Sequence, residues 1–209
     1  MNNDILTCFK DELGEAPVIA ILRGITPDSV LPVCRALAEG GVRFIEITLN
    51  SPSPAESIDL AATELTSKGI HIGAGTVLTS EQVDSVAEAG GSYIISPNTD
   101  PGVIRRTKEL GLLSIPGFLT PSEAFTAVKA GADMLKCFPA GRMGAGYIKD
   151  LKAVLPADIV AVGGINADNV QEYLNAGAYA AGIGSALFKP DISLEEIKTG
   201  TKKFMTEIR

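Results

Sequence analysis

The stretch PVIAILRGITPDSVLPVCRALAEGG, residues 17–41, decides the fold because it contains one complete strand–helix unit. Its apolar start, residues 17–22, is typical of a strand that is buried on both faces of a parallel sheet. Thr26 followed by Pro27 indicates the start of a helix, and the glycine pair at the end of the stretch indicates where that helix stops. A strand followed directly by a helix predicts a parallel βα architecture.

The same alternation recurs along the whole chain. The apolar runs expected to form strands are, in chain order, Pro17–Leu22, Val42–Thr48, Ile70–Gly73, Tyr93–Ser96, Leu112–Ile115, Asp133–Phe138, Asp158–Val162 and Tyr179–Ile183. Eight such units in a chain of 209 residues favour a closed (β/α)8 TIM barrel, with an open flavodoxin-like sheet as the alternative. We therefore expect one domain over residues 1–209, with an N-terminal helix over residues 1–16.

Composition excludes several classes of protein. With 45% hydrophobic and 21% charged residues, the chain has the make-up of an ordinary globular protein. Its 18 Lys and Arg against 25 Asp and Glu give a net charge of −7, the wrong sign for binding nucleic acid or an anionic membrane. The N-terminus lacks a basic region followed by an apolar run. We expect a soluble, cytoplasmic protein with no nucleic-acid or membrane partner.

Histidine and cysteine content limits the possible chemistry. His71 is the single histidine, whereas metalloproteases and Ser-His-Asp hydrolases need positioned imidazoles, so we expect no metal site. Cys8, Cys34 and Cys137 are odd in number and show no C-x-x-C spacing. These cysteines are expected to be reduced thiols.

Helix starts carry a second signal, the capping box, in which the cap and the residue three positions later bond to each other's backbone. We expect these residues to be structural. The pairs are Ser53 with Glu56, Thr79 with Gln82, Thr120 with Glu123, and Ser193 with Glu196.

Two charged residues lie inside apolar strands. Glu46 falls within FIEITL and Lys136 within MLKCF. The second and sixth strands of a barrel lie opposite one another, so both side chains are expected to meet in the interior. One interpretation is a buried salt bridge that helps to fix the register. The favoured interpretation is catalytic, with Lys136 as a neutral Schiff-base nucleophile and Glu46 as a proton shuttle beside it.

Other charges lie at strand boundaries. Arg43, Asp133 and Asp158 begin their strands, and we expect them to be solvated on the N-terminal face of the barrel. Arg23 follows the first strand, at the end where barrel enzymes build their active sites. It is interpreted either as a surface arginine or as a cation that lowers the pKa of Lys136 and binds a substrate carboxylate with two hydrogen bonds.

Glycines cluster at three expected strand ends, in the segments 73–76, 163–164 and 182–185. The last two follow the seventh and eighth strands, where barrels commonly bind phosphate through backbone N–H groups. The alternative is that these glycines only serve tight turns. No complete nucleotide-binding fingerprint is present.

The segments PVIAILRGITP, FIEITLNSP, IGAGTVLTSEQVD, IISPN, IPGFLTPSEAF, MLKCFPA, YIKDLKAVLP, AVGGI and GIGS follow one another through nearly the whole chain. In this order and spacing the chain resembles the 2-keto-3-deoxy-6-phosphogluconate and 2-keto-3-deoxy-6-phosphogalactonate aldolases, class I enzymes on a (β/α)8 barrel. The resemblance implies that Lys136 is the Schiff-base lysine and Glu46 the acid/base residue. The substrate-binding residues that it implies are Arg23, Thr76, Pro97, Phe138, Gly163, Gly164, Gly184 and Ser185.

One position separates the two branches of this family. Asn50 stands where the phosphogluconate branch has arginine, and phosphogalactonate-type members resemble this chain in having Asn-Ser-Pro there and an arginine at Arg23. The preference between the two substrates stays open at this point.

The implied reaction is cleavage of a phosphorylated 2-keto-3-deoxy sugar acid to pyruvate and D-glyceraldehyde 3-phosphate. It needs neither a metal nor an organic cofactor, and the resemblance also implies a homotrimer. Three alternatives remain: an aldolase for 4-hydroxy-2-oxoglutarate, a phosphosugar isomerase or epimerase that uses Glu46 as its base, and a noncatalytic protein that binds phosphorylated metabolites.

Overall fold

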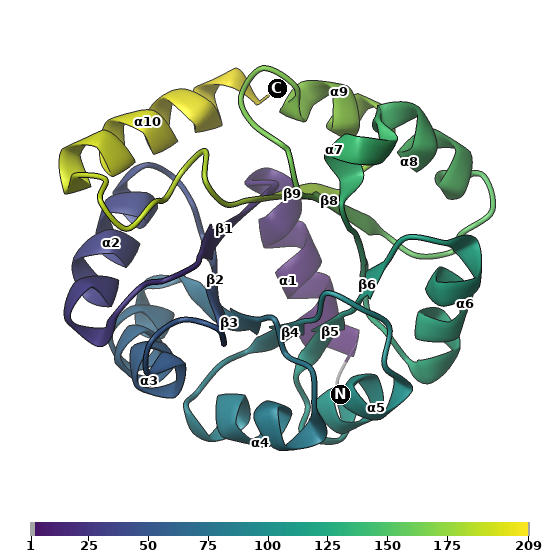
Figure 1. Ribbon diagram of the computed structural model, residues 1–209, viewed down its shortest axis with the longest axis horizontal. Coiled ribbons are helices and arrows are strands. Elements are labelled where there is room, and N and C mark those ends of the chain that lie inside the picture. The colour runs from purple at the N-terminus through teal and green to yellow at the C-terminus, as the bar shows by residue number, and fades with distance from the viewer. Residues whose placement is uncertain (1–2, 209) are drawn as a thin grey trace.

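A single parallel sheet curls into a barrel with helices around its outside (Figure 1). The structure, a computed structural model, describes residues 3–208. Residues 1, 2 and 209 of the predicted domain, and with them the first two residues of the predicted N-terminal helix, lie outside this range. The strands are β1 (Val18–Leu22), β2 (Phe44–Thr48), β3 (His71–Gly75), β4 (Tyr93–Ile95), β5 (Leu113–Ile115), β6 (Gly117–Phe118), β7 (Leu135–Cys137), β8 (Ile159–Val162) and β9 (Ala180–Ile183).

The strand order shows how the barrel closes. Neighbouring strands follow the order β5-β4-β3-β2-β1-β9-β8-β7-β6, so the two ends of the sheet are strands that follow each other directly in the chain. Pro116 separates them, and proline has no N–H to donate to a strand ladder. The eight predicted strands appear as nine, because the short strand β6, which the sequence did not predict, follows the fifth predicted strand after Pro116. The predicted (β/α)8 barrel is confirmed.

Helices connect the strands and cover the outer face of the sheet (Figure 1). Their bounds are α1 (Asn3–Glu15), α2 (Pro27–Glu39), α3 (Pro54–Leu65), α4 (Ser80–Glu88), α5 (Pro101–Glu109), α6 (Pro121–Ala130), α7 (Ala140–Met143), α8 (Ala145–Lys152), α9 (Val170–Asn175) and α10 (Leu194–Glu207), with a 3-10 turn at Thr66–Lys68. None of the helices within residues 3–208 has the length and apolar character needed to cross a membrane.

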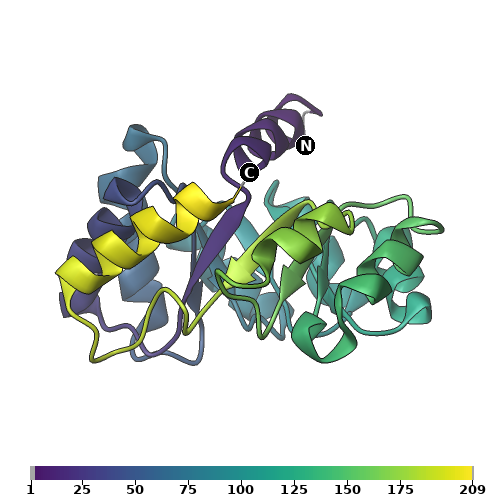
Figure 2. The ribbon, with the colours of Figure 1, turned by 90° about the horizontal axis from the view of Figure 1, so that it is seen from above.

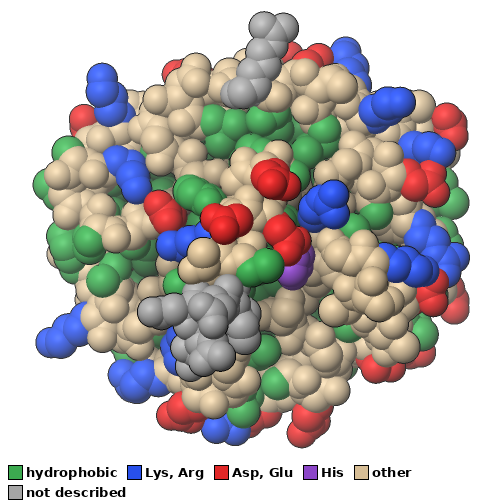
Figure 3. Space-filling model, turned by 180° about the vertical axis from the view of Figure 1, so that it is seen from behind, with side chains coloured by type: hydrophobic (Ala, Val, Ile, Leu, Met, Phe, Trp, Pro, Cys, Tyr) green, Lys and Arg blue, Asp and Glu red, His purple; other side chains and the backbone are tan. Residues whose placement is uncertain are grey.

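Helix α1 covers the N-terminal end of the barrel and projects from it in side view (Figure 2). Its Phe9 is buried and packs edge-on against Phe44 of β2, with ring centroids 4.7 Å apart. Nearer the surface, Oε2 of Glu12 is hydrogen-bonded to Nε2 of His71, with 2.8 Å between the two atoms. Figure 3 shows the histidine among acidic side chains near the middle of this face. The opposite end of the barrel is left open for a site.

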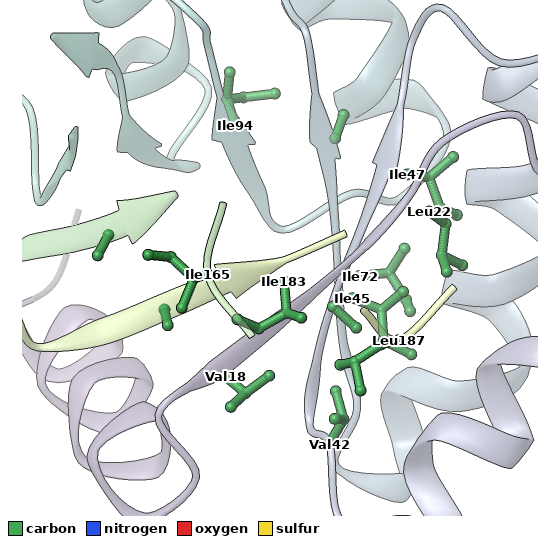
Figure 4. Packing of buried hydrophobic residues seen from close by; sticks show 14 of the residues in the cluster. Val18, Leu22, Val42, Ile45, Ile47, Ile72, Ile94, Ile165, Ile183 and Leu187 are labelled. Carbon is green, nitrogen blue, oxygen red and sulfur yellow. The ribbon is translucent and has the colours of Figure 1, made fainter. Parts of the chain in front are cut away.

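Apolar side chains fill two layers. One lies between the sheet and the helices, and Figure 4 shows part of it, with Ile45 and Ile72 paired on neighbouring strands β2 and β3. The other fills the barrel itself and includes Ile19, Phe44 and Tyr93. This alternation is what places every second residue of each strand in the barrel interior.

Two local predictions were wrong. Ser53 adopts a left-handed backbone with φ of 42° and its side chain makes no cap hydrogen bond, whereas the capping boxes at Thr79, Thr120 and Ser193 are confirmed. Asp133 is not solvated, since only 7% of its side chain is exposed. Its carboxylate accepts hydrogen bonds from the Ser114 N–H of β5 and from Lys108 of α5, so it joins these elements to the segment before β7 rather than facing water.

Candidate active site

A cavity of about 520 Å³ lies at the C-terminal ends of β1, β8 and β9. This volume is in the range of pockets that bind small metabolites. Its walls include six of the residues singled out from the sequence: Arg23, Phe138, Gly163, Gly164, Gly184 and Ser185. The other four, Glu46, Thr76, Pro97 and Lys136, are not among the residues that line it.

Lys136 adjoins the cavity through Phe138. It lies on β7 with 6% of its surface exposed, and its Nζ is 5.1 Å from the centre of the Phe138 ring. Gly117 is its partner across the ladder with β6. A side chain at Gly117 would meet the Pro97 backbone at 2.4 Å. Pro97, Gly117 and Lys136 therefore lie next to one another around the barrel wall.

Glu46 is buried in the interior, with 2% of its surface exposed. Its carboxylate lies over Gly75 of the neighbouring strand, so closely that a Cβ built at Gly75 would be 1.6 Å from Oε1. Its Oε2 is fully buried and has no hydrogen-bond partner. Burial raises the pKa of the Glu46 carboxyl above its ordinary value, while the positive charges of Lys136 and Arg23 act in the opposite direction.

The predicted meeting of Glu46 and Lys136 takes a looser form than a salt bridge. Both side chains are buried and come from β2 and β7, on opposite sides of the barrel. Among the described residues, no ion pair within 4 Å joins them. The charge of Lys136 still acts on the Glu46 carboxyl, so the two groups share one interior without forming an ion pair.

Thr76 follows β3 in a strained backbone conformation. Its φ is 60°, a region that β-branched residues rarely occupy. Such strain persists where the surrounding structure enforces it, commonly at functional sites. Thr76 comes directly after Gly75, the residue that Glu46 covers, so it lies at the rim of the same site.

The loop that carries Arg23 is held by hydroxyl groups from the neighbouring strand end. The Gly24 N–H donates to Ser51 Oγ at 2.9 Å, and Thr48 Oγ1 donates to the Leu22 carbonyl at 3.3 Å. Arg23 itself is exposed and lines the cavity. Sequence reasoning missed Ser51 because its role depends on the pairing of β1 with β2, although the turn after β2 is rich in serine.

The glycines predicted to bind phosphate form a tight turn. Gly163 and Gly164 have φ values of 92° and 79°, which a residue with a side chain adopts only with strain. The Gly141 N–H donates to the Gly163 carbonyl at 2.8 Å, and Asn169 Nδ2 donates to the Gly164 carbonyl at 3.0 Å. With both carbonyls engaged, the turn has a fixed shape.

Two backbone donors and one cation complete this end of the cavity. Among the hydrogen bonds of the described residues, the N–H groups of Gly164 and Ser185 donate to no protein acceptor. Lys189 also lines the cavity, at the end of the turn that follows β9. Sequence reasoning missed Lys189 because it lies beyond the glycine motif. Together these groups give this end of the cavity, which we call the donor corner, the chemistry needed to bind an anion in an otherwise acidic protein.

A smaller cavity of about 370 Å³ lies at the other end of the barrel, near α2 and the start of β2. Its wall includes Arg35 and Lys68, but both of these cations pair with Glu64. It is therefore a weaker candidate for binding an anion. No cluster of three metal-ligating side chains occurs within the described part of the chain.

Comparison with known proteins identifies the family. Residues 9–201 match the KDPG and KHG aldolase family. The 2-dehydro-3-deoxy-6-phosphogalactonate aldolase of Escherichia coli (strain K12) is 45% identical over 195 residues, which is 92% of this chain and 95% of that protein. A native KDPGal structure has a TM-score of 0.88 at 43% identity and covers 91% of this chain and 93% of its own.

A further solved structure bears on the chemistry. The KDPG aldolase of Legionella pneumophila, with pyruvate captured as a covalent carbinolamine intermediate, has a TM-score of 0.84 at 28% identity and covers 96% of this chain and 98% of its own. A relative with the same fold thus forms a covalent bond with pyruvate. The chain belongs to the KDPG and KHG aldolase family and is a carbon–carbon lyase.

Proposed function

We propose that this aldolase works as a single domain that cleaves a 2-keto-3-deoxy-6-phosphohexonate to pyruvate and D-glyceraldehyde 3-phosphate through a Schiff base on Lys136. The observation that carries the proposal is the buried Lys136 amine beside a cavity, with the buried Glu46 carboxyl facing the same interior. The covalent carbinolamine in the Legionella relative supports the same chemistry.

In the first half of the reaction, the neutral Lys136 amine attacks the C2 ketone of the substrate. Loss of water from the carbinolamine leaves a protonated imine, with Glu46 supplying the proton that the departing hydroxyl needs. The pKa of Glu46 is raised by burial, so this carboxyl takes up a proton more readily than an exposed one. The positive imine then serves as an electron sink.

In the second half, Glu46 removes the proton of the C4 hydroxyl through a water molecule. The C3–C4 bond breaks, its electron pair moves into the imine to form an enamine, and the aldehyde leaves. Glu46 then returns the proton to C3 of the enamine, and water hydrolyses the imine to release pyruvate and the Lys136 amine. Protons and electrons balance without any cofactor.

Substrate binding is divided between two groups of residues, one around the cavity end near Arg23 and the barrel interior beside it, and one around the glycine turn. Arg23 and Thr76 lie at strand ends near the reacting groups and are assigned to the substrate carboxylate. Gly163, Gly164 and Ser185 are assigned to the phosphate. Their backbone N–H groups are neutral donors, which can bind an anion without a positively charged side chain. Gly184 shapes this turn, and Pro97 and Phe138 line the path to Lys136.

We propose that the preferred substrate is of the phosphogalactonate type. The E. coli relative with 45% identity carries this activity in its name. Asn50, exposed at the end of β2, together with Arg23 follows the pattern of that branch rather than the arginine of the phosphogluconate branch. The two substrates differ in configuration at C4, so their kcat/KM values, compared on one enzyme preparation, test the assignment. A higher value for the phosphogluconate compound would overturn it.

We also propose a homotrimer that works in the cytoplasm. Phe125 on α6 and Met143 on α7, with 47% and 42% of their surfaces exposed, are apolar side chains available for subunit contact. All three cysteines are free thiols, as in proteins of a reducing compartment. Light scattering tests the assembly, and a monomer would contradict it.

The central experiment is borohydride reduction in the presence of pyruvate, followed by peptide mass spectrometry. We expect a stable adduct on Lys136 in the wild type and none in Lys136→Ala. Glu46→Gln is the informative companion, because it should still form the adduct yet turn over slowly. Absence of an adduct in the wild type, or full activity in Lys136→Ala, would refute the Schiff-base mechanism.

A further inference from the structure

Two buried polar atoms without partners lie inside the barrel. They are Oε2 of Glu46 on β2 and Oη of Tyr93 on β4. The two residues are 2% and 0% exposed, so solvent does not satisfy these atoms. Other buried atoms without partners among the described residues, such as Ser57 Oγ, belong to helices outside the barrel. A buried polar group without a partner is costly, which makes the pair a feature that needs an explanation.

The two side chains share one row of the sheet. Glu46 pairs with Gly73, and Gly73 pairs with Tyr93, across β2, β3 and β4. All three residues face the interior, because residues that are paired across a sheet point to the same side. Only the bare backbone of a glycine therefore separates the carboxylate from the phenol in this row.

Both groups lie over glycines of strand β3. A Cβ at Gly73 would be 2.4 Å from Cδ2 and Cε2 of the Tyr93 ring, and a Cβ at Gly75 would be 1.6 Å from Oε1 of Glu46. The Tyr93 ring thus lies over Gly73 and the Glu46 carboxylate over Gly75. These are successive inward positions of one strand, about 6.6 Å apart at a rise of about 3.3 Å per residue.

The neighbours of the two groups are an aromatic ring beside Tyr93 and two positive charges that act on Glu46. Phe9 of α1 packs against the Tyr93 ring with centroids 5.5 Å apart, closing the N-terminal side with an apolar surface. The charged groups that act on Glu46 are Lys136 from β7 and Arg23 after β1. Besides burial, the Glu46 charge and Cys34 of α2 raise the pKa of the Tyr93 phenol well above its usual range. The phenol therefore stays protonated and remains a hydrogen-bond donor.

We propose that Tyr93 is a positioning residue for Glu46, its hydroxyl donating to one buried water that in turn donates to the Glu46 carboxylate across the bare surface of Gly73 and Gly75. The inference rests on the role proposed above for Glu46. A donor to the carboxylate stabilises its charged form and fixes its orientation toward Lys136. Tyr93 touches no substrate atom and acts only through Glu46.

The test is the pH dependence of turnover in Tyr93→Phe, which removes the hydroxyl and keeps the ring. Loss of a donor to the carboxylate should raise the pKa of Glu46, moving the acidic limb of the kcat/KM profile upward by roughly one unit. At a pH on that limb we expect kcat to fall by about tenfold, since one unit is a tenfold change in proton affinity. The KM should change little, because the substitution does not alter the residues proposed to bind the phosphate.

Tyr179→Phe is the matched control. The Tyr179 hydroxyl donates to the Lys10 carbonyl at 2.7 Å, in α1 and outside the site, so its removal should leave the profile unchanged. A double variant adds a second check: in a Glu46→Gln background, Tyr93→Phe should have no further effect on the acidic limb, because the group it acts on is gone.

The outcomes separate this inference from the proposed function. If the wild type forms the borohydride adduct but Tyr93→Phe keeps the wild-type pH profile, Tyr93 is only a packing residue and the inference is overturned while the aldolase mechanism stands. If the wild type forms no adduct on Lys136, both fail. An upward shift in Tyr93→Phe with an intact adduct supports both.

Discussion

Replacement of Glu46 by glutamine should stabilise the protein at pH 8 while it slows the reaction. Glutamine has nearly the same shape, so it fits in the space over Gly75. It removes a carboxylate that is 2% exposed and has one oxygen without a partner. The variant thus exchanges a group placed for chemistry for one better suited to a dry interior.

The magnitude follows from the buried charge, because a glutamine amide in the same place is also polar and only the charge is removed. An unsatisfied buried polar group costs about 1–3 kcal/mol, and more when it is charged. Lys136 and Arg23 recover part of this cost, because their charges oppose the raised pKa of Glu46. We therefore expect a gain of about 1–2 kcal/mol, which for a chain of this length raises Tm by roughly 2–8 °C.

The raised pKa of Glu46 determines how the Tm difference between the variant and the wild type changes with pH. Because the pKa of Glu46 is raised in the folded state, the native protein binds this proton more tightly than the unfolded chain. The resulting stability is fully present below the ordinary glutamate value of about 4.3 and is lost as pH rises through the raised value. The Tm difference between Glu46→Gln and the wild type should therefore be largest at pH 8 and shrink toward pH 4.

Thermal unfolding at a series of pH values measures this difference, and Glu12→Gln provides a control of opposite sign. The hydrogen bond with His71 is the main cause that lowers the pKa of Glu12, so this carboxylate contributes stability above its ordinary value and loses it in acid. Glu12→Gln should lower Tm at pH 8. A lower Tm for Glu46→Gln at pH 8 would refute the argument and show that Glu46 belongs to a stabilising ion pair with Lys136.

Three further predictions use the same measurements. Lys136→Ala should abolish turnover while circular dichroism shows an intact barrel, and unfolding of this variant would contradict the view that the amine is not needed for the fold. Gly75→Ala should displace the Glu46 carboxylate and cut kcat at least tenfold, since its new Cβ would be 1.6 Å from Oε1; unchanged kcat would show that the carboxylate can act from elsewhere. Asp133→Ala should cost about 1–3 kcal/mol, because the Ser114 N–H loses its acceptor in a buried place, and a Tm equal to that of the wild type would contradict this.

The barrel could be predicted from sequence because its signal is local and repeated. Each strand is a short apolar run, and each following helix has its own start signal, so errors in one unit do not affect the next. The break at Pro116 was also readable in principle, since proline within a strand removes one donor. What the runs do not reveal is that this break is where the sheet closes.

Local signals failed where tertiary contacts decide. The Ser53-Pro-Ala-Glu pattern predicts a capping box, but the turn after β2 gives Ser53 a left-handed backbone that keeps its hydroxyl away from the cap position. Asp133 was expected to be solvated because it begins a predicted strand. In the structure its carboxylate is instead hydrogen-bonded to Lys108 of α5 and to the Ser114 N–H. Neither partner is near in sequence, so periodicity alone could not identify them.

Sequence singled out only some residues of the candidate site, and the reason is physical. Glu46 and Lys136 stood out because a charge within an apolar strand conflicts with burial, and that conflict is visible in sequence. Ser51 and Lys189 carry no such conflict, since polar residues in loops are ordinary. Their roles follow only from which strand ends lie side by side.

Gly73 and Gly75 support the role proposed for Glu46, because they lower stability at the place where that role needs space. The sequence predicts a strand that ends at Gly73 with a glycine-rich turn after it, whereas the structure extends β3 to Gly75 and points both glycines inward. Glycine weakens a strand, and an unpartnered carboxylate weakens a core. Both costs occur at the same place, since Glu46 can lie over β3 only if Gly75 has no side chain. A core built for stability alone would fill this space with apolar side chains, so a bare strand beside a buried acid is what the role proposed for Glu46 requires.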